Sequence, residues 1–249
     1  TINELKKFSK KFGIPIATAW THDLIPSNWL YYAGRPGTIG TRSGNLCLQN
    51  ADLVFVLGSR LNLRQTSFNW GSFAKKATIV HVDIDQSELD KFYLHSNYKI
   101  NIDLRLFFKT VNELNPINLK NKFGPWVNWC KKIGSKYSIK NEKFLKSPKG
   151  KLNPYEVLMF ISDILGDRDI MVCGNASACI IPFQTIEIKK NQRLFSNSGS
   201  ASMGYELPAS IGAALAKKKS FKSNIICFAG DGSFQMNIQE LQTLVSKEL

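Results

Sequence analysis

Short apolar runs alternate with amphipathic segments along most of this chain. The runs predict buried strands, because strands covered on both faces of a parallel sheet are apolar throughout. They lie at residues 14–19, 53–58, 78–85, 170–175, 193–195 and 224–229. Apolar residues at helical spacing predict helices over 2–12, 104–114, 155–165, 203–216 and 237–249. Strands that alternate with helices predict an α/β fold with doubly wound parallel sheets.

The alternation is interrupted once, by a lysine-rich segment. Residues 116–151 hold ten lysines, no arginine and one acid. Such a charge run favours a solvated connector, although residues 125–137 could form a helix with Trp126, Trp129 and Ile133 on one face. We therefore predict one domain over residues 1–115, a basic connector over 116–150 and a second domain over 151–249.

Composition limits the classes of partner. The net charge of +14 would suit a nucleic-acid-binding protein. However, only seven of the 33 basic residues are arginine, which is the better residue for bidentate recognition of phosphates and bases. We therefore expect no nucleic-acid partner. No apolar run approaches the roughly 18 residues of a membrane-spanning helix, so we expect no membrane partner either.

The five cysteines are scattered along the chain and form no Cys-x-x-Cys pair. They stand at positions 47, 130, 173, 179 and 227. This pattern predicts neither a disulfide framework nor a zinc site. A reducing, cytoplasmic setting fits such cysteines best.

The strongest chemical signal is Gly230-Asp231-Gly232-Ser233, where the last apolar run ends. Glycines let main-chain N–H groups approach a phosphate, and the N-terminus of a following helix favours negative charge. A carboxylate adds the hard oxygen ligand that suits Mg²⁺. The turn therefore predicts a metal–phosphate site with Asp231 as the metal ligand. The simpler alternative is that Asp231 only caps the last helix or makes a turn.

This turn is the last of three ordered motifs. They are Val172-Cys173-Gly174-Asn175, a stretch over residues 197–213 that contains Met203-Gly204, and a stretch over residues 230–241. Together they resemble the cofactor-binding domain of thiamine-diphosphate-dependent enzymes. Residues 51–60 and 81–85 resemble the central domain of the same enzymes. The whole pattern is similar to that of acetolactate synthase large subunits and their relatives.

The resemblance implies a role for each motif. Asp231 would bind Mg²⁺, which bridges the diphosphate of thiamine diphosphate. The residues that would contact this cofactor are Gly174, Asn175, Met203, Gly230, Gly232 and Ser233. Met203 would serve catalysis as the prop that bends the cofactor. By residue type alone, Met203 could instead be plain core, and Gly174 and Asn175 an ordinary strand-to-helix turn.

The implied reaction is decarboxylation of a 2-keto acid such as pyruvate and transfer of the two-carbon unit to a second keto acid. The alternatives within enzymes are a simple 2-keto acid decarboxylase or another carboligase. From a different class, the chain could be a non-catalytic nucleotide- or FAD-binding module.

The resemblance also implies parts that lie outside these residues. Family members carry an activating glutamate in a domain before the central one, and a second metal ligand in an Asn-Asn pair that would follow residue 249. We therefore expect a fragment of a longer chain, inactive alone. Because the family's active site is shared between subunits, we expect the full-length chain to form a homodimer or homotetramer.

Three features of the first domain bear on a further ligand. Residues 34–40 differ from those of well-known flavin-binding members, so FAD stays an open alternative. Arg60 and Arg64 follow a predicted strand and could meet a dinucleotide phosphate or form a structural ion pair. His81 lies in an apolar run, where a buried, hydrogen-bonded histidine is commoner than a catalytic one.

Overall fold

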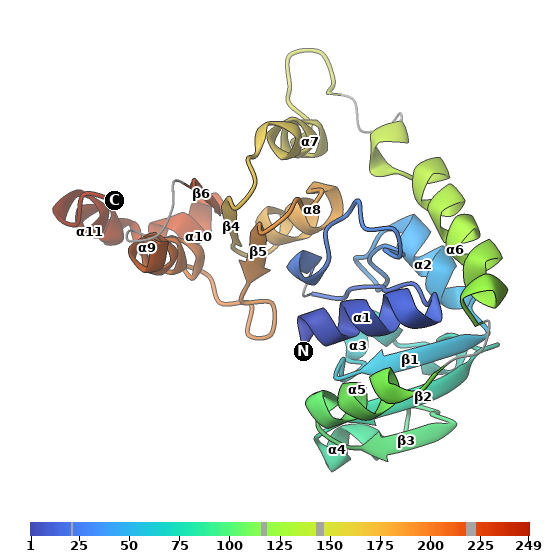
Figure 1. Ribbon diagram of the computed structural model, residues 1–249. Helices are drawn as coiled ribbons and strands as arrows, with labels where there is room; N and C mark the ends of the chain where they lie inside the picture. The colour runs from blue at the N-terminus through green and yellow to red at the C-terminus, as the bar shows by residue number, and fades with distance from the viewer. Residues whose placement is uncertain (21, 116–118, 143–146, 218–222) are drawn as a thin grey trace. The chain divides into compact units, whose positions relative to one another are not determined.

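The computed structural model describes residues 1–20, 22–115, 119–142, 147–217 and 223–249 (Figure 1). Their contacts divide the chain into two compact units. One consists of Thr1–Ala19 and Trp29–Asn141, and the other of Trp20–Asn28 and Glu142–Leu249. The excursion Trp20–Asn28 into the second unit is not part of the predicted domain boundaries.

The first unit is built on a parallel sheet in the order β1-β2-β3. Its strands are β1 (Leu53–Leu57), β2 (Thr78–Asp83) and β3 (Tyr98–Asn101). Its helical segments are α1 (Ile2–Phe12), α2 (Arg42–Gln49), α3 (Leu63–Thr66), η2 (Trp70–Ser72), α4 (Gln86–Leu89), α5 (Leu104–Glu113), α6 (Leu119–Lys136) and η3 (Ile139–Asn141).

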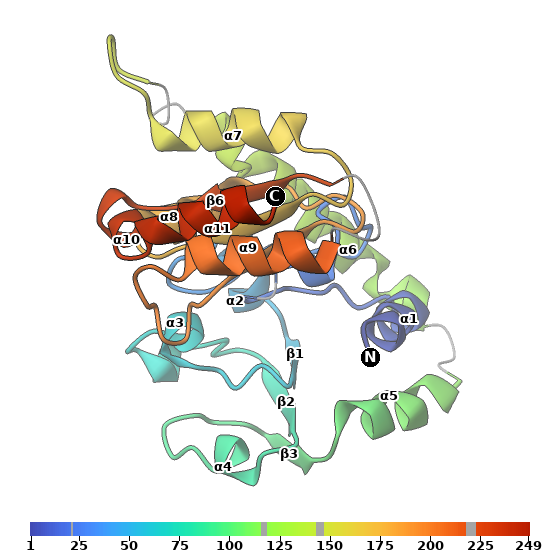
Figure 2. The same ribbon diagram turned by 90° about the vertical axis from the view of Figure 1, so that its left-hand side faces the viewer.

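Both faces of this sheet are covered. On one face, Phe8 of α1 and Phe108 of α5 pack in one cluster with Val82. On the other face, Val56 and Ile79 join a second cluster formed with the segments between the strands. Figure 2 shows α1 and α5 on one side of β1, β2 and β3, and α3 and α4 on the other. Successive strand residues point to opposite faces, so the apolar residues of β1 and β2 contribute to both clusters.

The predicted connector contains a packed helix. Trp126, Trp129 and Ile133 of α6 lie together and pack with Cys130 against Cys47 of α2. The two tryptophan rings stack with their centroids 4.8 Å apart. The lysines of α6 at positions 131, 132 and 136 are exposed. This part of the segment is therefore an amphipathic helix of the first unit rather than a solvated connector.

The second unit is built on a parallel sheet in the order β5-β4-β6. Its strands are β4 (Ile170–Cys173), β5 (Arg193–Ser196) and β6 (Ile225–Phe228). Its helical segments are η1 (His22–Leu24), α7 (Pro154–Ile164), α8 (Ser177–Thr185), α9 (Glu206–Lys217), α10 (Asp231–Gln235), η5 (Ile238–Glu240) and α11 (Leu241–Ser246).

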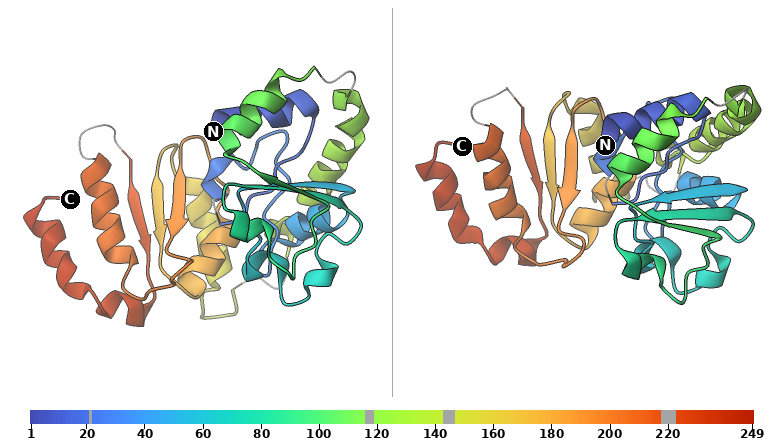
Figure 3. Two further views of the ribbon diagram at one scale, coloured as in Figure 1. Left: turned by 90° about the horizontal axis from the view of Figure 1, so that it is seen from below. Right: turned by 60° about the horizontal axis from the view of Figure 1, so that its bottom comes forward.

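Helices cover both faces of this second sheet. Met171 and Leu194 pack with Phe183 and Ile186 from α8 and the residue after it. Helix α9 packs against β4 and β6 and buries Leu207. Figure 3 shows the three strands side by side between α9 and α8. Because the central strand β4 is covered on both faces, all four of its residues are buried.

The predicted α/β class with parallel sheets is confirmed, with local corrections. The run at residues 14–19 is not a strand, since only Ile16 forms a bridge, to Tyr32. Strand β3 lacks an apolar run because all four of its residues are exposed. Helix α8 was not predicted from the sequence. It contains Pro182 in its interior, and a proline there argues against a helix. The helix predicted over 237–249 is divided into η5 and α11.

Candidate functional site

The turns that follow β4, β5 and β6 meet at one edge of the second sheet. The strands are parallel, with Cys173 opposite both Ser196 and Phe228 at their carboxyl ends. The N–H of Gly174 extends this pairing by donating to the carbonyl of Phe228 at 2.9 Å. In open α/β sheets this is the edge where ligands bind.

The turn after β4 is tightly confined. A Cβ on Gly174 would lie 2.8 Å from Cδ of Glu206, so only glycine fits there without a shift. The side-chain amide of Asn175 donates to the carbonyl of Ala201 at 3.1 Å. This bond joins the β4 turn to the segment that follows β5.

The turn after β6 presents one exposed carboxylate. Asp231 is the first residue of α10, after Gly230, and its Oδ1 accepts the N–H of Gly232 at 2.8 Å. Asp231 is itself exposed. Within the described ranges, no group of three or more His, Cys, Asp and Glu side chains could hold a metal ion. A metal held by Asp231 would therefore need further ligands of another kind, such as amide or main-chain oxygens, a bound phosphate or water.

The segment after β5 is fastened to the segment after β6. The N–H of Gly204 donates to Oγ of the buried Ser233 at 2.7 Å, and the side-chain amide of Asn237 donates to the carbonyl of Gly204 at 2.7 Å. Gly204 has a φ of 83°, which favours glycine. The Met203 Cε lies 3.3 Å from where a Cβ on Gly232 would be.

Met203 is therefore not a core residue of a helix. It precedes the first residue of α9, Glu206, and 47% of it is exposed. The plain-core alternative for Met203 is wrong, because the helix predicted over 203–216 begins three residues later, at Glu206.

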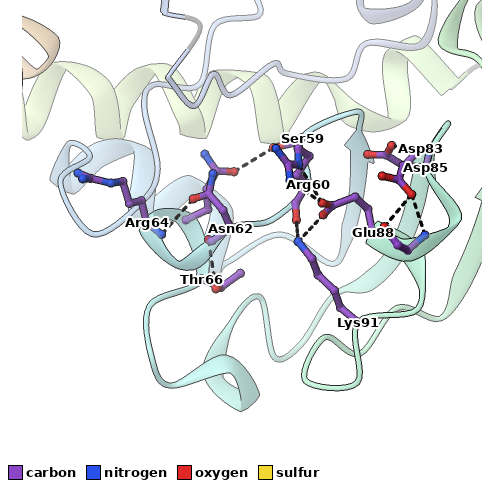
Figure 4. Close-up of polar contacts among 11 residues, drawn as sticks. Ser59, Arg60, Asn62, Arg64, Thr66, Asp83, Asp85, Glu88 and Lys91 are labelled. Carbon is purple, nitrogen blue, oxygen red and sulfur yellow. Dashed lines mark hydrogen bonds and ion pairs between the residues drawn. The ribbon is translucent and has the colours of Figure 1, made fainter. Parts of the chain in front are cut away.

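In the first unit, Arg60 takes part in an ion pair beyond the end of β1. Its Nη2 lies 2.9 Å from Oε1 of the buried Glu88, and Lys91 pairs with the other carboxylate oxygen (Figure 4). Burial tends to raise the pKa of Glu88, but the hydrogen bonds from Lys91 and Arg60 lower it overall. The structural ion pair, one of the two alternatives for Arg60, is thus present. The Arg64 side chain extends away from this pair (Figure 4).

His81 lies in the middle strand of the first sheet and is 1% exposed. Burial lowers its pKa. Neither ring nitrogen has a hydrogen-bond partner in the part of the chain that the structure describes. His81 is thus a core residue, as its apolar run indicates, but it is not a hydrogen-bonded one.

Comparison with known proteins matches both units of the chain to one family. Residues 1–112 match the family model "Thiamine pyrophosphate enzyme, central domain". Residues 174–249 match "Thiamine pyrophosphate enzyme, C-terminal TPP binding domain". The chain carries two domains of the thiamine pyrophosphate enzymes.

Relatives of this chain include several acetolactate synthases. Large subunits from Buchnera aphidicola and Lactococcus lactis are 28% and 29% identical over 96% and 98% of the chain, which covers 41% of each. A large subunit from Cyanidium caldarium is 33% identical over 88% of the chain, which covers 36% of it. The chain thus spans about two fifths of the length of the curated relatives it matches.

The structure brings the residues predicted for the cofactor to the carboxyl edge of the second sheet. Gly174 and Asn175 follow β4, Met203 follows β5, and the Gly230–Ser233 turn follows β6. Their individual roles stay predictions. No helix in the described ranges is long and apolar enough to cross a membrane.

Two further residues shape this edge, and neither was assigned a role from the sequence. Asn237 holds the Met203-Gly204 turn through its side-chain amide. Glu206 lies fully buried beneath Gly174. A charged residue beside the apolar sequence Leu207-Pro208-Ala209 was the one signal that could have marked Glu206.

Proposed function

We propose that this thiamine pyrophosphate enzyme binds thiamine diphosphate with Mg²⁺ at the carboxyl edge of the β5-β4-β6 sheet. The observation that carries the proposal is the meeting of three glycine-containing turns there, joined by the bonds from Gly204 to Ser233 and from Asn175 to Ala201. The space at Gly174 and at Gly232 is too small for a Cβ without displacement of a neighbour. These features fit a cofactor that is held by main-chain groups.

Each predicted residue has a physical task in this proposal. Asp231 would supply a carboxylate oxygen to Mg²⁺, and main-chain N–H groups of the turns would bind the diphosphate. Met203, partly exposed beside Gly232, presents an apolar thioether to the cofactor. Bound thiamine diphosphate would act as an electron sink for cleavage next to a carbonyl group.

For the reaction, we propose decarboxylation of a 2-keto acid such as pyruvate and transfer of the two-carbon unit to a second keto acid. The support is the recurrence of acetolactate synthases among the relatives. A shared active site in a homodimer or homotetramer of the full-length protein belongs to the same proposal.

Product analysis tests the reaction. The full-length protein is incubated with pyruvate, thiamine diphosphate and Mg²⁺, and CO₂, acetolactate and acetaldehyde are measured. We expect CO₂ and acetolactate, and neither when Mg²⁺ is removed by a chelator. Acetaldehyde without acetolactate would replace the proposal with a simple decarboxylase. No turnover of pyruvate or of longer 2-keto acids would overturn it.

The first unit leaves one alternative to compare, a nucleotide- or FAD-binding module. In its favour, Arg60 follows β1, and Asp85 follows β2. Both residues thus lie at the carboxyl ends of parallel strands, where dinucleotides bind in many α/β proteins. Against it, the Arg60 guanidinium already contacts Glu88. An absorption spectrum of the purified full-length protein decides, because bound FAD absorbs visible light and the unliganded protein does not.

A further inference from the structure

Glu206 is a buried acid that the proposed cofactor site does not use. It is 0% exposed, and neither carboxylate oxygen has a hydrogen-bond partner among the described residues. A Cβ on Gly174 would lie 2.8 Å from Cδ, 2.9 Å from Oε2 and 3.1 Å from Oε1. The nearly equal distances place the carboxylate face-on against the main chain of the β4 turn.

The two side chains recorded near this residue, Ser210 and Cys227, are a hydroxyl and a thiol. Ser210 donates its hydroxyl hydrogen bond to the main-chain carbonyl of Glu206, at 2.7 Å, and not to the carboxylate. Cys227 lies close enough to respond: burial raises the pKa of its thiol, a hydrogen bond with Ser210 lowers it, and the charge of Glu206 raises it further. An unpaired buried carboxylate is costly, although the N-terminus of α9 favours its negative charge.

The turns at the carboxyl ends of these strands, and most of the helices after them, carry no basic residue. Residues 174–188, 194–216 and 223–246 contain no Lys, Arg or His, in a protein with 33 Lys and Arg residues. The same segments hold four acids, at positions 187, 206, 231 and 240. An anionic diphosphate at this edge would therefore meet main-chain N–H groups and carboxylates.

We propose that Glu206 is a carboxylate whose charge makes this edge favour a diphosphate that carries a divalent cation over the free diphosphate. Its charge acts through the β4 turn, repelling the free diphosphate and attracting the metal that accompanies it. The inference rests on the proposed function, because it needs a diphosphate at this edge. It adds a residue that sets which form of the ligand is favoured: the metal complex over the free anion.

The sign of the effect distinguishes this role from a structural one. Removing one negative charge near both ligands strengthens binding of an anion and weakens binding of a cation. Loss of packing around Gly174 would instead weaken both, or neither. Glu206→Gln keeps the shape of the side chain and removes its charge.

The experiment titrates the full-length protein with two probes. One is inorganic pyrophosphate in the presence of a chelator, and the other is Mg²⁺ at a fixed concentration of pyrophosphate, both followed by calorimetry. For Glu206→Gln we expect metal-free pyrophosphate to bind on the order of tenfold more tightly, and the Mg²⁺ concentration at half-saturation to rise on the order of tenfold. Glu206→Asp, which keeps the charge, should restore both values toward the wild type.

Ser210→Ala is the matched control, because it alters the same turn of α9 and keeps the charge of Glu206. It should move neither affinity. If Glu206→Gln does not fold, as judged by circular dichroism, Glu206→Met provides a second uncharged variant. Shifts of both affinities in the same direction, or no shift, would overturn the role of Glu206 while leaving the proposed function intact. Absence of any wild-type binding of pyrophosphate and of thiamine diphosphate with Mg²⁺ would overturn both.

Discussion

The main-chain N–H of Gly204 donates to the Ser233 hydroxyl at 2.7 Å, so two turns that follow different strands are directly joined. Ser233 is 2% exposed, and its bond therefore competes little with water. The carbonyl of the same glycine accepts from Asn237. Both main-chain groups of Gly204 are held by the segment after β6, which fixes Met203 beside Gly232.

Ser233→Ala should separate these turns. The variant leaves the N–H of Gly204 without its acceptor, which should cost about 1–2 kcal/mol of stability. Affinity for thiamine diphosphate should also fall, because two of its contact turns lose their shared bond. Denaturant unfolding and calorimetry measure the two effects. Ser246→Ala, at an exposed serine, is the control and should change neither.

Gly174→Ala should destabilise the second unit by about 1–3 kcal/mol, because the added methyl meets the Glu206 carboxylate at 2.8 Å. Gly199→Ala is matched, since nothing lies within 4 Å of a Cβ at Gly199. In a Glu206→Ala background the Gly174→Ala cost should shrink, which a double-mutant cycle measures. An undiminished cost there would mean that the methyl clashes with something other than Glu206.

Met203→Ala should lower turnover without lowering the unfolding free energy. Met203 is 47% exposed, so the unfolding free energy should change by less than about 0.5 kcal/mol. Turnover should fall at least ~10-fold if the side chain holds the cofactor in its reactive shape. Met159→Ala on α7 serves as the control for turnover. Unchanged turnover in Met203→Ala would remove Met203 from the proposed site.

The contacts of Glu88 should make the unfolding free energy of the first unit fall as the pH is lowered. Because the pKa of Glu88 is lowered in the folded protein, the unfolded chain takes up this proton first as the pH falls. The stabilisation is complete above the ordinary glutamate pKa of about 4.3 and is lost as the pH falls through the folded value. Unfolding by denaturant between about pH 7 and pH 3 should show a shallower pH dependence for Glu88→Gln. Glu113→Gln, at an exposed position, should follow the wild type.

The fold was predictable to the extent that apolar runs mark buried strands. Strand β4 is buried throughout and was found from its sequence, whereas the exposed β3 carries no such mark. The apolar run at residues 14–19 shows the limit of the rule. Its residues pack as an irregular segment with one bridge, because apolar character reports burial and not hydrogen-bonding partners.

The candidate site was predictable where glycines and a carboxylate follow strands, since parallel strands bring their ends together. The bond from Gly204 to Ser233 and the carboxylate beneath Gly174 were not, because residues 29 or 32 positions apart show no local signal of contact. Arg60 illustrates the same limit. Its partner Glu88 lies 28 residues away, so sequence alone left a phosphate and an ion pair as equal alternatives.

The most direct test of the account is calorimetric binding of thiamine diphosphate to the full-length protein and to its Asp231→Asn variant. The variant keeps the shape of the side chain and removes the anionic metal ligand. We expect the wild type to bind in the presence of Mg²⁺ and not without it, and Asp231→Asn to bind at least ~10-fold more weakly because it lacks the negative charge beside the metal. Equal affinity in the two proteins, or wild-type binding that does not need Mg²⁺, would contradict the account.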